Sequence, residues 1–155
     1  MKVADSLSIT GEIFFYMNNS ADGAGRLVAH VTNLVVTVGQ QWVAQRMAGS
    51  TSPAPLDMDY MAIGQDTVAP VLGDIELRQE LGRVKMAATP QVTANRITYT
   101  ATFAEGIGTG GITEAGIFDS SVNGTMLSRS VFPVVNKQVD DYLTVLWVIS
   151  VGTPL

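Results

Sequence analysis

Apolar and polar residues alternate most regularly between residues 96 and 104 (RITYTATFA). Successive side chains of a strand point to opposite faces, so this stretch predicts a strand with one apolar face and one face of threonines. Residues 140–151 also alternate, and one face of this segment carries Leu143, Val145, Trp147, Ile149 and Val151. The opposite face carries Leu146 and Val148, so we expect this last strand to be covered on both sides, with Trp147 as a core anchor.

The N-terminal part of the chain predicts a β-hairpin. Residues 7–17 (LSITGEIFFYM) are rich in β-branched and aromatic side chains, and residues 26–36 (RLVAHVTNLVV) form a second such run. The intervening residues 18–25 (NNSADGAG) form a turn cluster, with Asp22-Gly23 as its left-handed position.

A helix is predicted over residues 38–48, where the period changes. Val38, Trp42, Val43 and Met47 fall on one face at helical spacing. Thr37 and Gln40 match a capping box, and Gly49 stands where a glycine ends many helices. Residues 49–56 (GSTSPAPL) then predict an extended linker, because residues before proline avoid the α region.

The remaining segments predict further short strands, at residues 58–63, 83–88, 112–119 and 125–132. Residues 67–82 fit either a short helix or an irregular strand, and residues 90–95 fit a turn. We therefore predict a mainly β protein, an antiparallel β-sandwich with one α-helix and an N-terminal β-hairpin arm. The predicted division is an arm over residues 1–32 and a sandwich domain over residues 33–155.

Composition favours a protein that associates with other subunits. Of the 155 residues, 46% are hydrophobic and only 15% are charged, against about 25% charged in typical globular proteins. The net charge of −5 argues against a nucleic-acid partner, which needs clustered Lys and Arg. No apolar run reaches the roughly 18 residues of a membrane span, so we expect no membrane partner.

Candidate catalytic and ligand-binding motifs are weak. Residues 106–111 (GIGTGG) match a dinucleotide fingerprint but lead into a predicted strand, whereas that fingerprint needs a helix. His30 is the single histidine, and the chain has no cysteine. Three further sets of carboxylates are candidate cation ligands or an acid–base pair: Asp57, Asp59 and Asp66; Asp140 and Asp141; and Glu105 and Glu114. None has the order or surroundings that such chemistry requires, so we expect no catalytic residue, no metal and no cofactor.

Apolar side chains in the hairpin and the last strand suggest a partner interface. Phe14 and Phe15 are consecutive, so an extended strand displays at least one of them on each face. Either they contact another subunit, or the hairpin belongs to the sandwich and both faces are covered. The predicted interface residues are Leu7, Ile9, Ile13, Phe14, Phe15, Leu146 and Val148.

Four segments, taken in order, resemble a known family. They are residues 33–49 (NLVVTVGQQWVAQRMAG), 58–66 (MDYMAIGQD), 112–119 (ITEAGIFD) and 143–151 (LTVLWVISV). In order and spacing they resemble the tail-collar fibre domain of bacteriophages and related small phage virion proteins. The resemblance implies a non-enzymatic virion structural protein, assembled in the bacterial cytoplasm, that forms a homotrimer and contacts the major capsid protein or other virion proteins.

Two virion roles follow from this resemblance. No fibre shaft or receptor-binding tip follows the domain in this sequence, so we expect a capsid decoration (cement) protein rather than a tail collar or fibre adaptor. A carbohydrate-binding β-sandwich is a third, less favoured reading. In the decoration role the predicted arm would reach a neighbouring virion protein.

Overall fold

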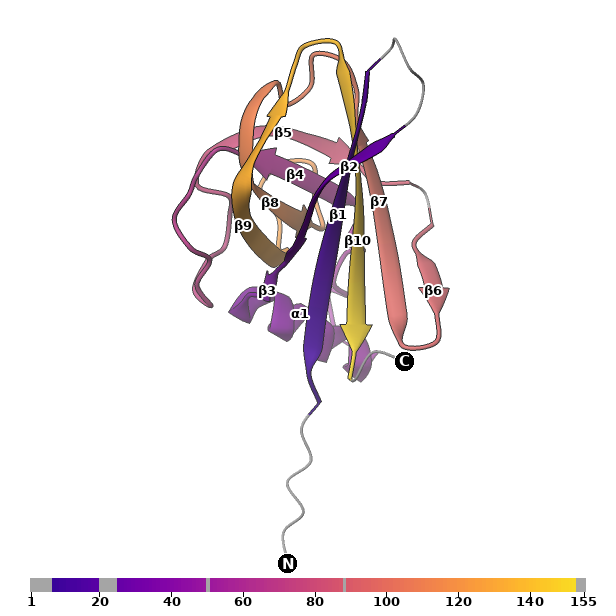
Figure 1. Ribbon diagram of the computed structural model, residues 1–155. Helices are drawn as coiled ribbons and strands as arrows, with labels where there is room; N and C mark the ends of the chain where they lie inside the picture. Colours follow the sequence, from indigo (N-terminus) through magenta and orange to yellow (C-terminus); the bar gives the residue numbers. More distant parts are fainter. Residues whose placement is uncertain (1–6, 20–24, 50, 88, 153–155) are drawn as a thin grey trace, which may run out of the picture.

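The computed structural model describes residues 7–19, 25–49, 51–87 and 89–152, and two antiparallel sheets make up most of this part of the chain (Figure 1). Sheet A has the strand order β2-β1-β10-β7-β6, and sheet B has the order β3-β9-β8-β4-β5. The strands of sheet A are β1 (Ile9–Asn19), β2 (Arg26–Thr32), β6 (Gln91–Thr93), β7 (Arg96–Phe103) and β10 (Asp141–Val151). The strands of sheet B are β3 (Leu34–Val35), β4 (Tyr60–Gly64), β5 (Glu80–Lys85), β8 (Gly110–Phe118) and β9 (Met126–Lys137). The predicted antiparallel sandwich with one helix is confirmed.

The core lies between the two sheets and follows the predicted alternation. Leu143, Val145, Trp147 and Ile149 of β10 are all buried in it. Trp147 is 0% exposed, and its indole Nε1 donates a hydrogen bond to Asn33 Oδ1 at 3.2 Å. Burial of the ring together with a partner for its N–H makes Trp147 the core anchor that the sequence predicted.

The N-terminal hairpin is present, but it is part of the sandwich rather than a separate arm. β1 pairs with β10 along all of its length, from Ile9–Val151 to Asn19–Asp141, and with β2 on its other side. Ile13 and Phe15 are 0% exposed in the shared core. The predicted boundary between an arm over residues 1–32 and a domain over residues 33–155 is therefore wrong, because the core needs β1.

The helix α1 (Thr37–Ala48) begins one residue earlier than predicted and without the predicted cap. Val36 is the capping residue, and no side chain caps the helix there. The backbone N–H of Thr37 donates to Leu72 O at 2.8 Å, and the N–H of Gln40 donates to Val36 O at 2.9 Å instead of to the Thr37 side chain. Gly49 ends the helix in the left-handed conformation (φ 67°), as predicted.

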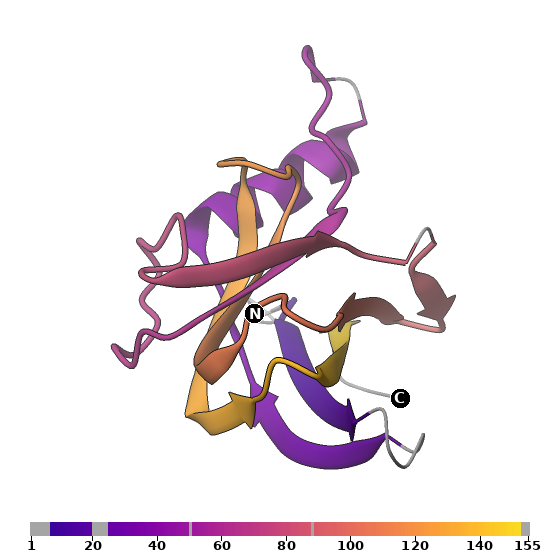
Figure 2. The same cartoon turned by 90° about the horizontal axis from the view of Figure 1, so that it is seen from above.

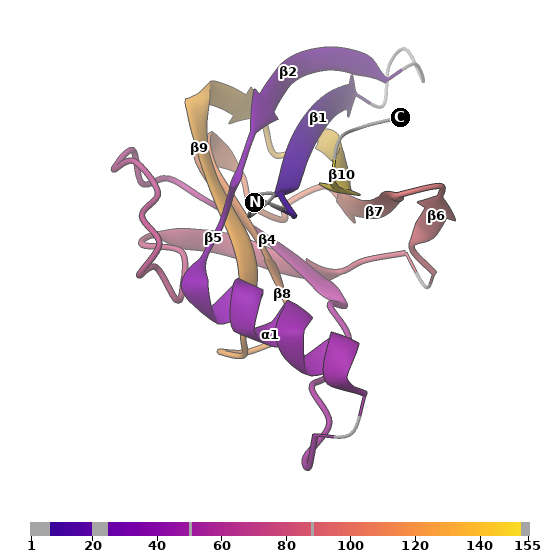
Figure 3. The same ribbon diagram turned by 90° about the horizontal axis from the view of Figure 1, so that it is seen from below.

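Gly39 explains how closely the helix approaches sheet B. It is the buried residue of α1, and a methyl group at its Cα would overlap the carbonyl oxygen of Leu127 in β9. Trp42 and Val43 pack against the core from the same helix, whereas Met47 of the predicted apolar face is 75% exposed. Figure 3 shows α1 running along the strands of sheet B.

Two segments differ from the sequence prediction. Residues 91–93 form the short edge strand β6 instead of a turn. Residues 65–79 form a long loop between β4 and β5, called the 65–79 loop below, in place of the short helix or strand that the sequence left open. Loops of about 15 residues without regular structure are uncommon and are often functional.

Candidate functional site

A buried charge cluster ties the 65–79 loop to sheet B. Arg129 of β9 is 0% exposed, and so is Glu114 of the neighbouring strand β8. Arg129 Nε and Nη2 donate to Glu114 Oε2 at 3.0 and 2.8 Å. Arg129 Nη1 donates to Asp74 Oδ2 at 2.9 Å and to the carbonyl of Val68 at 3.1 Å. One arginine thus joins the sheet to two positions of the loop.

Glu114 also accepts hydrogen bonds from the loop backbone. Its Oε1 accepts from the N–H of Gln79 at 2.8 Å and from the N–H of Asp66 at 3.3 Å. Its Oε2 accepts from the N–H of Arg78 at 3.2 Å. Glu114 thus accepts hydrogen bonds from three backbone N–H groups of the loop and also binds a buried guanidinium. Because these N–H groups lie near both ends of the loop, the carboxylate fixes the loop backbone at both ends.

Asp74 completes the cluster from within the loop. Burial by itself would raise the pKa of Asp74, but the hydrogen bond from Val71 N–H and the guanidinium of Arg129 outweigh it and hold the pKa below its ordinary value of 3.8. Asp66 lies 3.3 Å from Arg129 Nη2 at the more exposed side of the cluster. With both oxygens of Glu114 and every terminal nitrogen of Arg129 engaged, the cluster is arranged to hold a loop in one conformation.

The loop held in this way exposes apolar side chains. Val68, Val71, Leu72 and Ile75 are each about half exposed or more. The neighbouring Leu77 points inward and packs with Val36, Ala62, Phe118 and Met126 in a small second core on the outer side of sheet B. We call the exposed set of Val71, Leu72 and Ile75 the loop surface.

A second apolar surface is a groove between the helix and the end of sheet A. It has a volume of about 280 Å³. It is lined by Ile9, Trp42, Val43, Arg46, Met47, Ile97, Tyr99, Leu127, Ile149 and Val151. Arg46 stands over the ring of Trp42, 5.2 Å from its centroid, and pairs with the exposed carboxylate of Asp57. Burial raises the pKa of Tyr99, although Arg46 opposes this shift.

The outer face of sheet A contains part of the predicted partner interface. Phe14 and Leu146 lie opposite each other on β1 and β10, and Val148 lies one row further along. These three side chains are partly exposed, and the ring of Phe14 stacks on His30 with centroids 4.3 Å apart. His30 Nε2 lies 3.4 Å from Glu12 Oε1, so the single histidine belongs to this face.

The other predicted interface residues do not form one surface. Ile13 and Phe15 are wrong as interface residues, because the pairing of β1 with β10 turns them into the core. Leu7 is well exposed at the start of the described chain, and Ile9 lines the apolar groove. For Phe14, Leu146, Val148, Leu7 and Ile9, the interface role stays a prediction.

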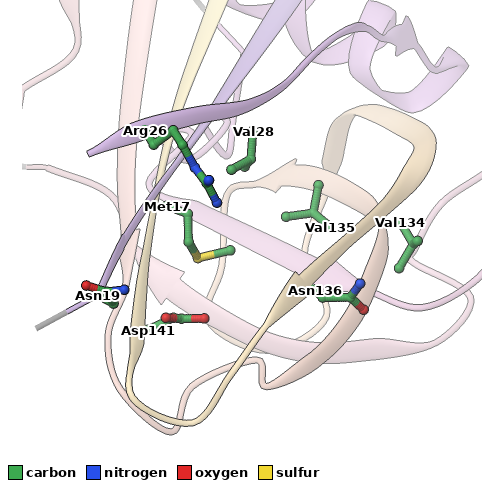
Figure 4. Close-up of a pocket in the computed structure, with 8 residues that line it drawn as sticks. All are labelled: Met17, Asn19, Arg26, Val28, Val134, Val135, Asn136 and Asp141. Carbon is green, nitrogen blue, oxygen red and sulfur yellow. The ribbon is translucent and has the colours of Figure 1, made fainter. Parts of the chain in front are cut away.

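A larger and more polar cleft lies at the end of the sandwich away from the helix (Figure 4). Its volume is about 470 Å³, and its lining includes Met17, Arg26, Val28, Asn136 and Asp141. In Figure 4 Met17 lies between the charged groups of Arg26 and Asp141. No aromatic ring is among its described lining residues.

The three aspartates considered as cation ligands are each engaged separately. Asp57 pairs with Arg46, Asp59 lies 3.6 Å from Lys85 Nζ, and Asp66 contacts Arg129. Asp141 Oδ2 accepts from the N–H of Gln138 at 2.8 Å in the turn before β10. Within the described ranges, no three His, Cys, Asp or Glu side chains form a group that could hold a metal ion.

The acid–base pair considered from the sequence is also divided. Glu114 belongs to the buried cluster, whereas Glu105 is exposed in the turn before β8. Gly106 and Gly108 lie in that turn, whereas Gly110 and Gly111 already belong to β8, so this glycine-rich segment leads into a strand, as predicted, rather than into a helix. The pyrophosphate-binding geometry of a dinucleotide site is therefore not built here.

Two buried cations of β9 escaped the sequence prediction. Arg129 stands between Ser128 and Ser130 in the mainly apolar first half of this strand, and it was the one available signal for a buried cluster. Lys137 is 1% exposed, and its Nζ donates to the carbonyl of Ala104 at 2.9 Å. Burial lowers the pKa of Lys137, and Asp141 and Glu105 oppose the shift.

The fold is thus an antiparallel β-sandwich whose long loop is fixed by a buried charge cluster. Comparisons of the chain with protein-family models, with curated proteins and with solved structures find no match. In the described part of the chain, no helix has the length and apolar character needed to cross a membrane.

Proposed function

We propose that this protein is a structural component of a bacteriophage virion that decorates the outside of the capsid shell. The four segments that resemble the tail-collar fibre domain support a virion protein. On this proposal its partners are other copies of itself, as a homotrimer, and the major capsid protein. The trimer is taken from the resemblance, since domains of that type commonly assemble in threes.

The outer face of sheet A is the observation that carries the proposal. Across four strands its described positions include Leu27, His30 and Thr32 on β2, Thr10, Glu12, Phe14 and Tyr16 on β1, Thr144, Leu146, Val148 and Ser150 on β10, and Arg96, Thr98, Thr100 and Thr102 on β7. Glu12 is the one carboxylate among these positions. A broad face of aromatic, aliphatic and threonine side chains with few charged groups, among them Glu12 and Arg96, is typical of a surface that meets another protein.

Charge favours the outside of the shell. The chain carries a net charge of −5, so packaged DNA would repel it. On the outer surface, weak contacts repeated over many copies add up to stable decoration.

The attachment surface in this proposal replaces the N-terminal arm expected from the sequence. Deleting residues 1–20 would remove β1 from between β2 and β10 of sheet A, and with it Ile13 and Phe15 from the core. Such a truncation would unfold the protein instead of leaving a folded sandwich, so it cannot test attachment. Point substitutions on the outer face can.

Attachment is tested with isolated capsids that lack the protein. Purified wild-type protein should bind them, and Leu146→Lys should abolish binding because it places a charge in the centre of the face. Val122→Lys is the matched control, since Val122 is 71% exposed in the loop between β8 and β9. Equal binding of wild type and Leu146→Lys would rule out this face as the attachment surface.

The location on the particle separates the two virion roles. Immunogold labelling of intact virions with antibodies against this chain should mark the whole shell. Label confined to the tail would replace the decoration role by that of a collar or fibre adaptor. Particles without any label would exclude both.

A further inference from the structure

The protein carries an exposed apolar projection and an exposed apolar recess in different places. The projection is the loop surface, in which Leu72 is 52% and Ile75 is 61% exposed. The recess is the apolar groove beside α1, whose rim includes Met47. Each of these surfaces alone would leave apolar area in contact with water.

The projection is rigid before any contact is made. Arg129 and Glu114 hold the loop backbone from the sheet, and Asp74 holds it from inside the loop. Rigid loops lose little conformational entropy on binding, so the exposed side chains are presented in a binding-ready arrangement. A buried ion pair often adds little net stability compared with apolar packing. The Arg129–Glu114 pair instead serves to hold the 65–79 loop in one conformation.

The projection and the recess of one chain cannot meet each other. The loop abuts the N-terminal end of α1, where Leu72 O accepts from Thr37 N–H (Figure 2). The groove lies along the later part of the helix, at Trp42, Arg46 and Met47. Nine residues separate Thr37 from Arg46, which is about 14 Å along a helix, and the charge cluster prevents the loop from crossing that span.

Charge complements the apolar match. Arg46 stands at the groove, where its described salt-bridge partner Asp57 is largely exposed. Glu76 is an exposed carboxylate directly next to Ile75 on the loop. Because each copy carries a net charge of −5, two copies repel unless their contact brings opposite charges together, and a Glu76–Arg46 pair does so.

We propose that the 65–79 loop of one copy docks in the apolar groove of the next copy, with Leu72 and Ile75 in the groove and Glu76 facing Arg46. The contact uses two different surfaces, so its repetition builds a ring when the rotation closes. This inference rests on the self-association proposed above but not on the capsid role, and it leaves the outer face of sheet A free.

Light scattering at micromolar concentration gives the first test. Wild-type protein should have a mass of several chains, and Leu72→Asp and Met47→Asp should each reduce it to that of one chain. Val139→Asp is the control, because Val139 is 57% exposed at the turn between β9 and β10, away from both surfaces. Thermal unfolding of each variant establishes that it is folded. A single-chain mass for the wild type, or an unchanged mass for both folded variants, would overturn the inference.

Charge exchange gives a second test. Glu76→Arg and Arg46→Glu should each weaken association at least about tenfold, and the double variant should recover it, because the pair is then restored with opposite sign. A double variant that associates no better than the single variants contradicts the proposed pairing.

Crosslinking identifies the contact directly, since the chain has no cysteine. Chains with Ile75→Cys should form a disulfide with chains with Met47→Cys when the two are mixed under mild oxidation, and neither variant should crosslink to itself. Self-crosslinking of Ile75→Cys without the mixed product would indicate a symmetric contact and overturn the inference. Capsid binding by Leu146→Lys is independent of these results, so failure here is distinguishable from failure of the capsid role.

Discussion

Arg129 and Glu114 occupy adjacent strands of sheet B, and two nitrogens of the guanidinium donate to the same carboxylate oxygen at 3.0 and 2.8 Å. Both residues are 0% exposed. Removing one partner of a buried ion pair leaves the other charge without compensation. The pair therefore offers a sensitive measure of how much the fold depends on the 65–79 loop.

Glu114→Gln should reduce the free energy of unfolding by about 3–5 kcal/mol, because it leaves Arg129 buried without its main counter-charge. Urea titration measures the loss. Asp59→Asn is the control: Asp59 pairs with Lys85 Nζ at 3.6 Å with both side chains largely exposed, and its loss should stay below about 1 kcal/mol. Similar losses in the two variants would show that burial of the cluster adds nothing.

Replacing both partners should not restore stability. In many proteins, replacing a buried ion pair by apolar side chains of similar volume costs no stability. Glu114, however, also accepts hydrogen bonds from the N–H groups of Gln79, Arg78 and Asp66. The double variant Arg129→Met, Glu114→Met should therefore remain less stable than wild type. Wild-type stability in that variant would mean that these loop amides need no acceptor from the sheet.

Trp147→Ala should lower the free energy of unfolding by about 3–5 kcal/mol, since it empties a large volume in the core. The substitution also leaves Asn33 Oδ1 without the indole donor. Trp147→Phe retains an aromatic ring and should have a smaller effect. A loss below about 1 kcal/mol for the alanine variant, measured in urea, would contradict the anchoring role.

Gly39→Ala should destabilise the protein by about 1–3 kcal/mol, although alanine is the better helix former. The added methyl group would overlap Leu127 O and push α1 away from β9. Gln41→Ala, at an exposed position of the same helix, should change stability by less than about 0.5 kcal/mol.

Thr37→Ala should change the free energy of unfolding as little as Gln41→Ala does, because the Thr37 side chain makes no cap.

Asp74 should make the protein sensitive to acid. Its pKa is lower in the folded protein than the ordinary value of 3.8, so its stabilisation is complete above that value and is lost as the pH falls through the folded pKa. Unfolding midpoints in urea between about pH 2 and 5 should decline with falling pH, and the decline should be shallower in Asp74→Asn. Asp57→Asn, at an exposed carboxylate, should retain the wild-type slope.

Periodicity predicted the strands whose faces differ in polarity. β7 and β10 lie within one residue of the predicted positions, because threonines and apolar residues alternate in β7 and a full apolar face marks β10. Gly49 likewise ends the helix, because its role depends on local backbone conformation. These features depend on near neighbours in sequence, which pattern analysis captures.

The hydrophobic pattern could not predict contacts between residues that lie far apart in the sequence. The sequence could not distinguish a separate arm from a strand inside sheet A, because β10, the partner of β1, lies more than a hundred residues later. It offered Thr37 as a cap, whereas the acceptor for Thr37 N–H comes from Leu72. The cluster around Arg129 escaped prediction for the same reason, since its carboxylates come from β8 and the 65–79 loop.

The pairing of β1 with β10 also has a consequence for synthesis of the protein. Of the described strands, β1 leaves the ribosome first and its partner β10 leaves it last. Until β10 emerges, Ile13 and Phe15 lack the strand that completes their burial, and β1 presents an open edge. Contacts so distant in sequence form slowly, so the nascent chain passes through a long interval in which pairing with another chain competes with folding.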